Sequence, residues 1–273
     1  MHNHSDEQQA NVSRRAFVVS GASVLATAIA SPLALRAQTL AAIRPSQSER
    51  LTDPSRLDAR PTPTTETIAP GTHRLRLGAE RDGFLYVPPS YRPAVAAPLL
   101  VLLHGAGQSS AEWQRTSLDA VFAAHNVIAL VPDSRDATWD IVMGGFGPDV
   151  AFIDRALRFT YARCNINPKQ IGLMGFSDGA SYALSLGITN GDLFSGLVAL
   201  SPGFLRPATE RAKPRMFFAH GTADRILPID AASRRMVPLL RRSGYDVTYV
   251  EFDGPHRIMP PIVSEAVDWF VTG

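Results

Sequence analysis

Residues Ile171 to Tyr182 read IGLMGFSDGASY, an apolar run followed by Gly175-Phe176-Ser177-Asp178-Gly179 and then by helix-forming residues. This is the G-x-S-x-G pattern of a nucleophile elbow, a sharp strand-to-helix turn that exposes a serine hydroxyl. A serine hydroxyl is a poor nucleophile unless it is exposed, oriented and paired with a base. The two glycines provide the room that the turn needs. Patterns of five residues also occur by chance, so the rest of the chain must supply the partners of Ser177.

Three further segments carry those partners, each directly after an apolar or alternating run: HGAG at 104–107, HGTAD at 220–224 and DGPH at 253–256. A nucleophilic serine needs a histidine base, an acid that orients the histidine, and backbone donors for an oxyanion. We therefore expect Ser177, Asp224 and His256 to form a catalytic triad. The chain order Ser, Asp, His is that of α/β-hydrolases and differs from that of chymotrypsin or subtilisin.

The segments HGAG, GFSDGA, HGTADRILP and FDGPH together resemble the phospholipase/carboxylesterase family of α/β-hydrolases, over about Thr72 to Phe270. In that family the serine acts on carboxylic esters, so the resemblance implies a serine esterase. The backbone N–H groups of Ala106 and Asp178 would then form the oxyanion hole. Relatives often carry a neutral residue after the nucleophile, and Asp178 instead places a carboxyl group near the expected oxyanion.

The pattern of apolar residues predicts an α/β-hydrolase fold for residues 71–273. Nearly continuous apolar runs are typical of parallel strands that are covered on both faces, and they occur at 99–103, 127–131, 171–174, 196–200 and 215–219. Alternating segments predict an antiparallel pair and a last strand, at 72–77, 83–87 and 247–252. Helical patterns lie between most of the strands, at 111–124, 149–163, 178–188, 230–242 and 262–271. We expect a mostly parallel, doubly wound sheet of about eight strands flanked by helices.

This fold would bring the motifs together, because ligands in open α/β sheets bind at the carboxyl ends of the strands. Ala106, Ser177, Asp224 and His256 all follow predicted strands. The same edge should carry the substrate pocket, for which we expect walls from the connection 137–147 and from the segment after Asp224. The pocket candidates are Trp139, Met143, Phe146 and Ile226. The equally compatible alternative is that these apolar residues anchor a loop to the core.

Other titratable residues compete for roles in this site. His104 and His220 precede glycines in their loops, and we expect both to brace those loops by hydrogen bonds. Three further carboxyl groups lie in or near loops that follow strands, but they precede the nucleophile and so break the family order: Asp133, Asp136 and Asp140. Asp149 opens a helix and is expected to cap it.

The amino-terminal residues 1–37 resemble a twin-arginine export signal. Arg14-Arg15 precede a moderately apolar stretch that Ser, Gly and Thr dilute, and Ala30 and Ala37 offer cleavage sites. A membrane anchor would need about 20 strongly apolar residues. We therefore expect the export machinery to bind the precursor, no stable membrane anchor, and a mature protein that is periplasmic or secreted.

Residues 38–70 are rich in Pro, Thr, Ser and Arg and predict a disordered linker. The single cysteine, Cys164, permits no intramolecular disulfide and is expected to be a small buried apolar residue.

Composition and motifs restrict the partners. The chain has 273 residues and a formal net charge of only +2, with scattered arginines, which does not indicate nucleic acid as a partner. The histidine spacing fits no metal site, and no Gly-Lys-Ser/Thr follows the loop at 104–107, so we expect no metal and no cofactor. The expected partner is a small-molecule ester of a small to medium acyl group. Amidases, peptidases and polyester depolymerases use the same triad, and a non-catalytic binding protein of this fold is a further alternative.

Overall fold

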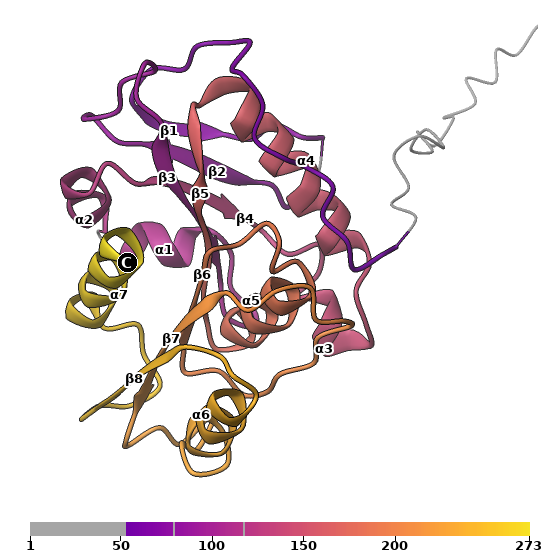
Figure 1. The fold of residues 1–273 in the computed structure, drawn as a ribbon, viewed down its shortest axis with the longest axis vertical. Coiled ribbons are helices and arrows are strands. Elements are labelled where there is room, and N and C mark those ends of the chain that lie inside the picture. The colour runs from indigo at the N-terminus through magenta and orange to yellow at the C-terminus, as the bar shows by residue number, and fades with distance from the viewer. Residues whose placement is uncertain (1–52, 79, 117) are drawn as a thin grey trace, which may run out of the picture. The chain divides into compact units, whose positions relative to one another are not determined.

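A single sheet of eight strands forms the centre of the computed structural model, which describes residues 53–273 apart from residues 79 and 117 (Figure 1). The strands are β1 (Gly71–Arg74), β2 (Gly83–Val87), β3 (Ala97–Leu103), β4 (Ile128–Pro132), β5 (Ile166–Phe176), β6 (Gly196–Leu200), β7 (Arg215–Gly221) and β8 (Val247–Phe252). Their order across the sheet is β1-β2-β4-β3-β5-β6-β7-β8. The first two strands join antiparallel, and all later neighbours are parallel. The predicted fold class is confirmed.

Seven helices of the described part cover the two faces of the sheet: α1 (Ala111–Arg115), α2 (Asp119–Ala124), α3 (Asp140–Met143), α4 (Pro148–Arg163), α5 (Asp178–Thr189), α6 (Ser233–Arg242) and α7 (Pro260–Thr272). Helices α1, α2 and α7 lie on one face, and α3 to α6 lie on the other (Figure 1). Two apolar clusters correspond to these layers. Phe152 and Leu186 belong to the cluster on the α4 and α5 side, whereas Trp113 and Phe270 belong to the cluster on the α1 and α7 side. Strands β3, β4 and β6 are buried along their whole length, as the apolar runs predicted.

Two of the elements that differ from the sequence prediction do so for clear local reasons. The helix expected over 111–124 is interrupted, because Thr116 ends α1 and donates its hydroxyl hydrogen bond to the Trp113 carbonyl at 2.5 Å. Side-chain bonds of this kind compete with a continuing helix. Strand β5 begins at Ile166 rather than at Ile171, since Ile166 pairs with Ala97 past a bulge in β3. The residues between them, 167–170, are Asn, Pro, Lys and Gln and give no apolar signal.

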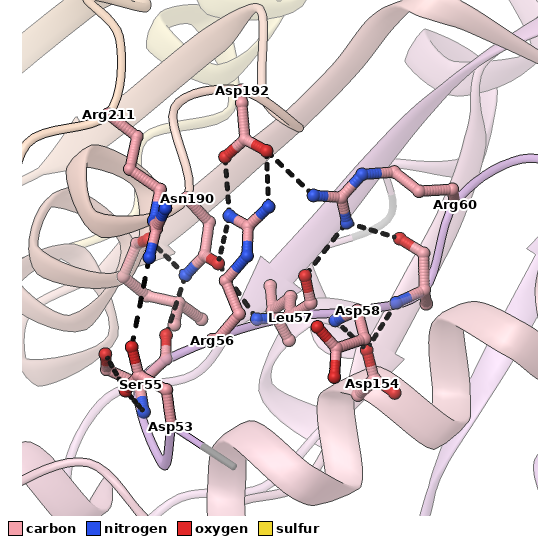
Figure 2. A network of polar contacts seen from close by, with 12 residues as sticks. Asp53, Ser55, Arg56, Leu57, Asp58, Arg60, Asp154, Asn190, Asp192 and Arg211 are labelled. Carbon is pink, nitrogen blue, oxygen red and sulfur yellow. Dashed lines mark hydrogen bonds and ion pairs between the residues drawn. The ribbon is translucent and has the colours of Figure 1, made fainter. Parts of the chain in front are cut away.

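The segment before β1 contradicts the predicted linker. Leu57 and Ala59 are completely buried, and residues 53–60 form a strap along α4 and the end of α5. Figure 2 shows Asp192 between the guanidinium groups of Arg56 and Arg60, which both pair with it. These contacts fix the strap on the domain, so the expectation of a disordered linker is wrong for residues 53–60.

Backbone hydrogen bonds, in addition to the side-chain contacts, hold the strap on the domain. The Leu57 N–H donates to Asn190 Oδ1 at 2.9 Å, and Asn190 donates in turn to the Ser55 carbonyl. The Ala59 N–H donates to the buried Asp154 on α4 at 2.6 Å. Because buried polar groups need such partners, the strap completes the fold on this side. The folded unit therefore begins well before residue 71.

The expected export signal at residues 1–37 and the linker residues 38–52 lie outside the described residues. Within the described part, no helix combines the length and the apolar character that crossing a bilayer requires. Cys164 is buried, as expected, and burial raises the pKa of its thiol to about 12.

Candidate active site

Ser177 lies at the sharp turn between β5 and α5. Its φ of 57° and ψ of −121° place a non-glycine residue in a strained conformation, which costs about 1–3 kcal/mol and occurs mainly at functional sites. The glycines on both sides are required by close packing. A Cβ on Gly175 would lie 2.1 Å from the Gly179 carbonyl oxygen, and a Cβ on Gly179 would lie 2.3 Å from the Leu103 carbonyl oxygen. The sequence therefore folds into a nucleophile elbow at this turn.

The structure brings the three expected triad residues into one hydrogen-bonded chain. His256 Nε2 lies 2.9 Å from Ser177 Oγ, and His256 Nδ1 lies 2.6 Å from Asp224 Oδ2. Ser177 follows β5, Asp224 follows β7 and His256 follows β8, so all three lie at the carboxyl edge of the sheet. With Nδ1–H donated to the carboxylate, Nε2 is the acceptor for the serine proton.

Asp224 is held in its ionised form although it is buried. Burial opposes ionisation, but the hydrogen bonds from His256 and from the backbone N–H groups of Leu227 and Ile226 outweigh it. The pKa of Asp224 therefore lies below its ordinary value. This carboxylate can orient His256 and stabilise the imidazolium that forms when His256 takes a proton.

His220 braces the Asp224 loop, as expected from the sequence. Its Nε2 lies 2.8 Å from the Leu227 carbonyl and 3.2 Å from Asp224 Oδ2, and its Nδ1 lies 2.7 Å from Ser233 Oγ. A carbonyl only accepts hydrogen bonds, so Nε2 carries the proton and Nδ1 accepts from the serine hydroxyl. Burial lowers the pKa of His220, which keeps this fully buried ring neutral.

The two N–H groups expected to form the oxyanion hole come from two different segments. The Asp178 N–H belongs to the first residue of α5, and the Ala106 N–H belongs to the loop after β3. Neither donates a hydrogen bond to another described residue. Helix amino termini favour negative charge. Both groups therefore remain proposed donors for an oxyanion.

The Asp178 side chain is engaged away from this N–H. Its Oδ2 accepts the Thr138 hydroxyl at 2.7 Å. Asp178, the residue that departs from the family pattern, therefore links α5 to the 137–147 connection. Sequence reasoning missed Thr138, because a threonine in a loop carries no signal for such a partner.

The other carboxyl groups weighed against Asp224 do not contact His256. Asp133 accepts the N–H groups of Ser110 and Asp82, and Asp136 accepts the N–H of its neighbour Ala137. Asp140 accepts the N–H groups of Gly147 and Asp149. Each of the three fixes loop backbone, whereas Asp224 is the carboxyl group that is hydrogen-bonded to His256.

Asp149 is the second residue of α4, after Pro148, but it does not cap its own helix as expected. Its carboxyl oxygens accept the N–H groups of Arg135 and Asp140, so it fastens the preceding connection instead. Burial, together with the nearby charge of Asp140, raises the pKa of Asp149 to about 6. The sequence correctly indicated that the Asp149 carboxyl group accepts backbone N–H groups. Those N–H groups belong to the preceding connection, however, and not to the first turn of α4.

The expected pocket residues separate into two groups. Trp139 is fully buried, stacks on Tyr182 with ring centroids 5.0 Å apart, and cannot form the wall of an open pocket. Phe146 is half-buried and contacts the same Tyr182 ring. Met143 and Ile226 are exposed, at 72% and 70%, and their contact with a substrate stays a prediction. The core-anchoring alternative therefore holds for Trp139.

A cavity of about 370 Å³ adjoins α3 and includes Met143, Thr138 and Asp140 in its lining. Thr138, one of the lining residues, is hydrogen-bonded to Asp178, the residue that follows the nucleophile. Within the described residues, no cluster of His, Cys, Asp and Glu has the arrangement of a metal site.

Comparisons with known proteins match this architecture. A profile described as the Alpha/beta hydrolase family matches residues 100–271. The comparison with curated proteins finds no significant match. Among solved structures, the fluorophosphonate-binding serine hydrolase F of Staphylococcus aureus is 14% identical, with a TM-score of 0.60 over 75% of this chain and 100% of that chain.

Two further similar structures are esterases by name. Esterase PE8 is 22% identical, with a TM-score of 0.55 over 68% of this chain and 96% of that chain. The CE1 ferulic acid esterase of Anaeromyces mucronatus is 17% identical, with a TM-score of 0.55 over 70% of this chain and 84% of that chain. At these identities the likeness establishes the fold, and the chemistry must be argued from this chain's own residues.

Proposed function

The chain belongs to the alpha/beta hydrolase family, and from that premise we propose that it is a serine hydrolase that cleaves carboxylic esters of small to medium acyl groups. One observation carries the proposal: the hydrogen-bonded chain from Asp224 through His256 to a strained, elbow-mounted Ser177. Such a chain has the geometry of an activated nucleophile, in which a base contacts the serine and an acid orients the base.

The first half of the reaction forms an acyl-enzyme. Ser177 Oγ bonds to the ester carbonyl carbon while its proton moves to His256 Nε2. The carbonyl oxygen becomes an oxyanion, which accepts hydrogen bonds from the N–H groups of Ala106 and Asp178. The carbon–oxygen bond to the alcohol then breaks, and His256 gives its proton to the departing alcohol oxygen. Asp224 stays ionised throughout and stabilises the imidazolium.

The second half repeats these steps with water. His256 accepts a proton from water, whose oxygen bonds to the acyl carbon and forms a second oxyanion in the same place. The bond to Ser177 Oγ breaks, Oγ recovers the proton from His256, and the carboxylic acid leaves. In this proposal the same two N–H donors serve both halves, and one such donor contributes about 10²–10³-fold to turnover in enzymes of this type.

The ester preference rests on the sequence resemblance and on the neighbours that are esterases by name. The exposed side chains of Met143 on α3 and of Ile226 in the loop after Asp224 are the apolar contacts that we propose for a short acyl or alcohol group. On the basis of the sequence resemblance, we also propose that the chain belongs to the phospholipase/carboxylesterase branch of the family.

A panel of p-nitrophenyl esters of rising chain length tests the proposal, run beside a peptide amide and a soluble polyester oligomer. We expect the short and medium esters to be the best substrates. The Ser177→Ala variant should lose several orders of magnitude in turnover, with about 10³–10⁴-fold over water left by the oxyanion hole and binding. Peptide-amide turnover above ester turnover would overturn the ester assignment, and undiminished Ser177→Ala activity would overturn the nucleophile.

A further inference from the structure

The direction of the Ala106 N–H is set by the peptide groups that precede it. In a trans peptide the C=O and N–H point in opposite directions, so the Gly105 carbonyl and the Ala106 N–H are turned together. That carbonyl accepts His104 Nδ1–H at 2.8 Å and the Gln108 N–H at 3.2 Å. With the carbonyl held on one side, the Ala106 N–H points to the other.

The preceding peptide group, between His104 and Gly105, is held at both ends. Its carbonyl accepts the indole N–H of Trp139 at 2.8 Å, and its N–H donates to Glu112 Oε2 at 2.8 Å. Glycine allows a wide range of backbone angles, so Gly105 contributes no stiffness of its own. The hydrogen bonds must therefore fix this loop.

Glu112 supplies its bond from α1, beside the nucleophile. A Cβ on Gly105 would lie 3.5 Å from Ser177 Cβ and 3.7 Å from Glu112 Oε2. Ser177 and Glu112 therefore both lie close to Gly105. Glu112 is half-buried there, and burial raises the pKa of its carboxyl group. A half-buried carboxyl group needs hydrogen-bond partners that offset its desolvation, and the Gly105 N–H is such a partner.

We propose that Glu112 is a positioning residue: by accepting the Gly105 N–H, it holds the loop 104–107 in the conformation that directs the Ala106 N–H toward the oxyanion. Glu112 does not touch the substrate. It acts through Gly105 on the direction of the Ala106 N–H, and its hydrogen-bond acceptor matters more than its charge. The inference rests on the proposed function, because it concerns the oxyanion hole of the same reaction.

Three variants separate the acceptor from the charge. Glu112→Gln keeps an acceptor oxygen at the same reach without the charge, Glu112→Asp keeps the charge but shortens the reach, and Glu112→Ala removes both. Loosening a donor costs less than deleting it, so we expect kcat to fall about 10- to 100-fold in the Ala and Asp variants. KM should change by less than about threefold, as for an interaction made only in the transition state. The Gln variant should recover most of the wild-type kcat.

Glu265→Ala is the matched control, because Glu265 is an exposed glutamate on α7. Melting temperatures of all variants separate loss of fold from loss of positioning, and the Asp and Gln variants decide the matter if the Ala variant does not fold. Wild-type kcat in both the Asp and Ala variants, or a Gln variant as impaired as Asp, would overturn the inference. A wild-type protein that neither cleaves esters nor reacts at Ser177 would instead refute the proposed function, so the two failures are distinguishable.

Discussion

Replacing Leu57 by alanine tests whether the strap is part of the folded domain. Leu57 is completely buried within the core cluster on the α4 and α5 side, and its N–H is bonded to Asn190. A disordered linker would tolerate the change without effect. The structure instead predicts a cavity beneath the strap and a lower free energy of unfolding.

The size of the effect follows from the burial. The substitution removes three carbon atoms from a fully buried side chain, which corresponds to about 2.4 kcal/mol of lost transfer free energy at about 0.8 kcal/mol per carbon. The cavity term raises the cost, and buried Leu→Ala changes lie at about 2–5 kcal/mol. We expect about 3 kcal/mol. For a domain of this size each kcal/mol lowers the melting temperature by about 2–4 °C, which gives a decrease of about 6–12 °C.

Thermal unfolding followed by circular dichroism measures this shift, with urea unfolding as a second measurement. Leu239→Ala is the matched control, because it is the same substitution at a side chain that is 56% exposed on α6. Surface changes of this kind stay within about 0.5 kcal/mol. Activity at 25 °C should persist in both variants, since the strap contacts Asn190 at the far end of α5 from Ser177. A Leu57→Ala variant with the same melting temperature as the Leu239→Ala variant would refute the reasoning.

Three other predictions concern pH, packing and export. Because the folded pKa of Asp149 is raised to about 6, its contribution to stability is complete below its ordinary pKa and is lost as pH rises through about 6. The stability advantage of wild type over Asp149→Asn should therefore shrink by up to about 2 kcal/mol between about pH 4 and 7 in urea unfolding; a constant difference would contradict this. Gly179→Ala would place its Cβ 2.3 Å from the Leu103 carbonyl oxygen, so we expect a cost of about 1–3 kcal/mol and a turnover at least tenfold lower. We propose twin-arginine export to the periplasm, in which case changing Arg14 and Arg15 to Lys should trap the precursor in the cytoplasm on cell fractionation; unaltered export would refute the proposal.

The parts of the molecule that depend on apolar patterning could be predicted from the sequence. Strands β6 and β8 begin and end where their runs predicted. The relation between Ser177, Asp224 and His256 was also foreseeable, because parallel strands bring their carboxyl ends to one edge of a sheet. In the structure, His256 is hydrogen-bonded to both Ser177 and Asp224 at this edge.

The rest depends on individual contacts that a sequence does not display. The strap contains Leu57 and Ala59 among Pro, Ser, Asp and Arg residues, so its composition indicated disorder although two buried side chains and Asn190 hold it in place. From the sequence, Trp139 could equally line a pocket or anchor a loop, and the choice depends on its complete burial, its stacking on Tyr182 and its indole bond to the His104 carbonyl. Glu112 lies in a short helix with no motif around it, so its partner Gly105 became visible only in three dimensions.

The most direct test of the central claim is covalent labelling of the folded protein by one equivalent of a fluorophosphonate, read by intact mass and peptide mapping. The reagent reacts with activated serines, and one of the structural neighbours is named for binding it. We predict a single adduct on Ser177, which is absent in Ser177→Ala and forms at least tenfold more slowly in His256→Ala. Folded protein that acquires no adduct, or acquires it on another residue, would contradict the account.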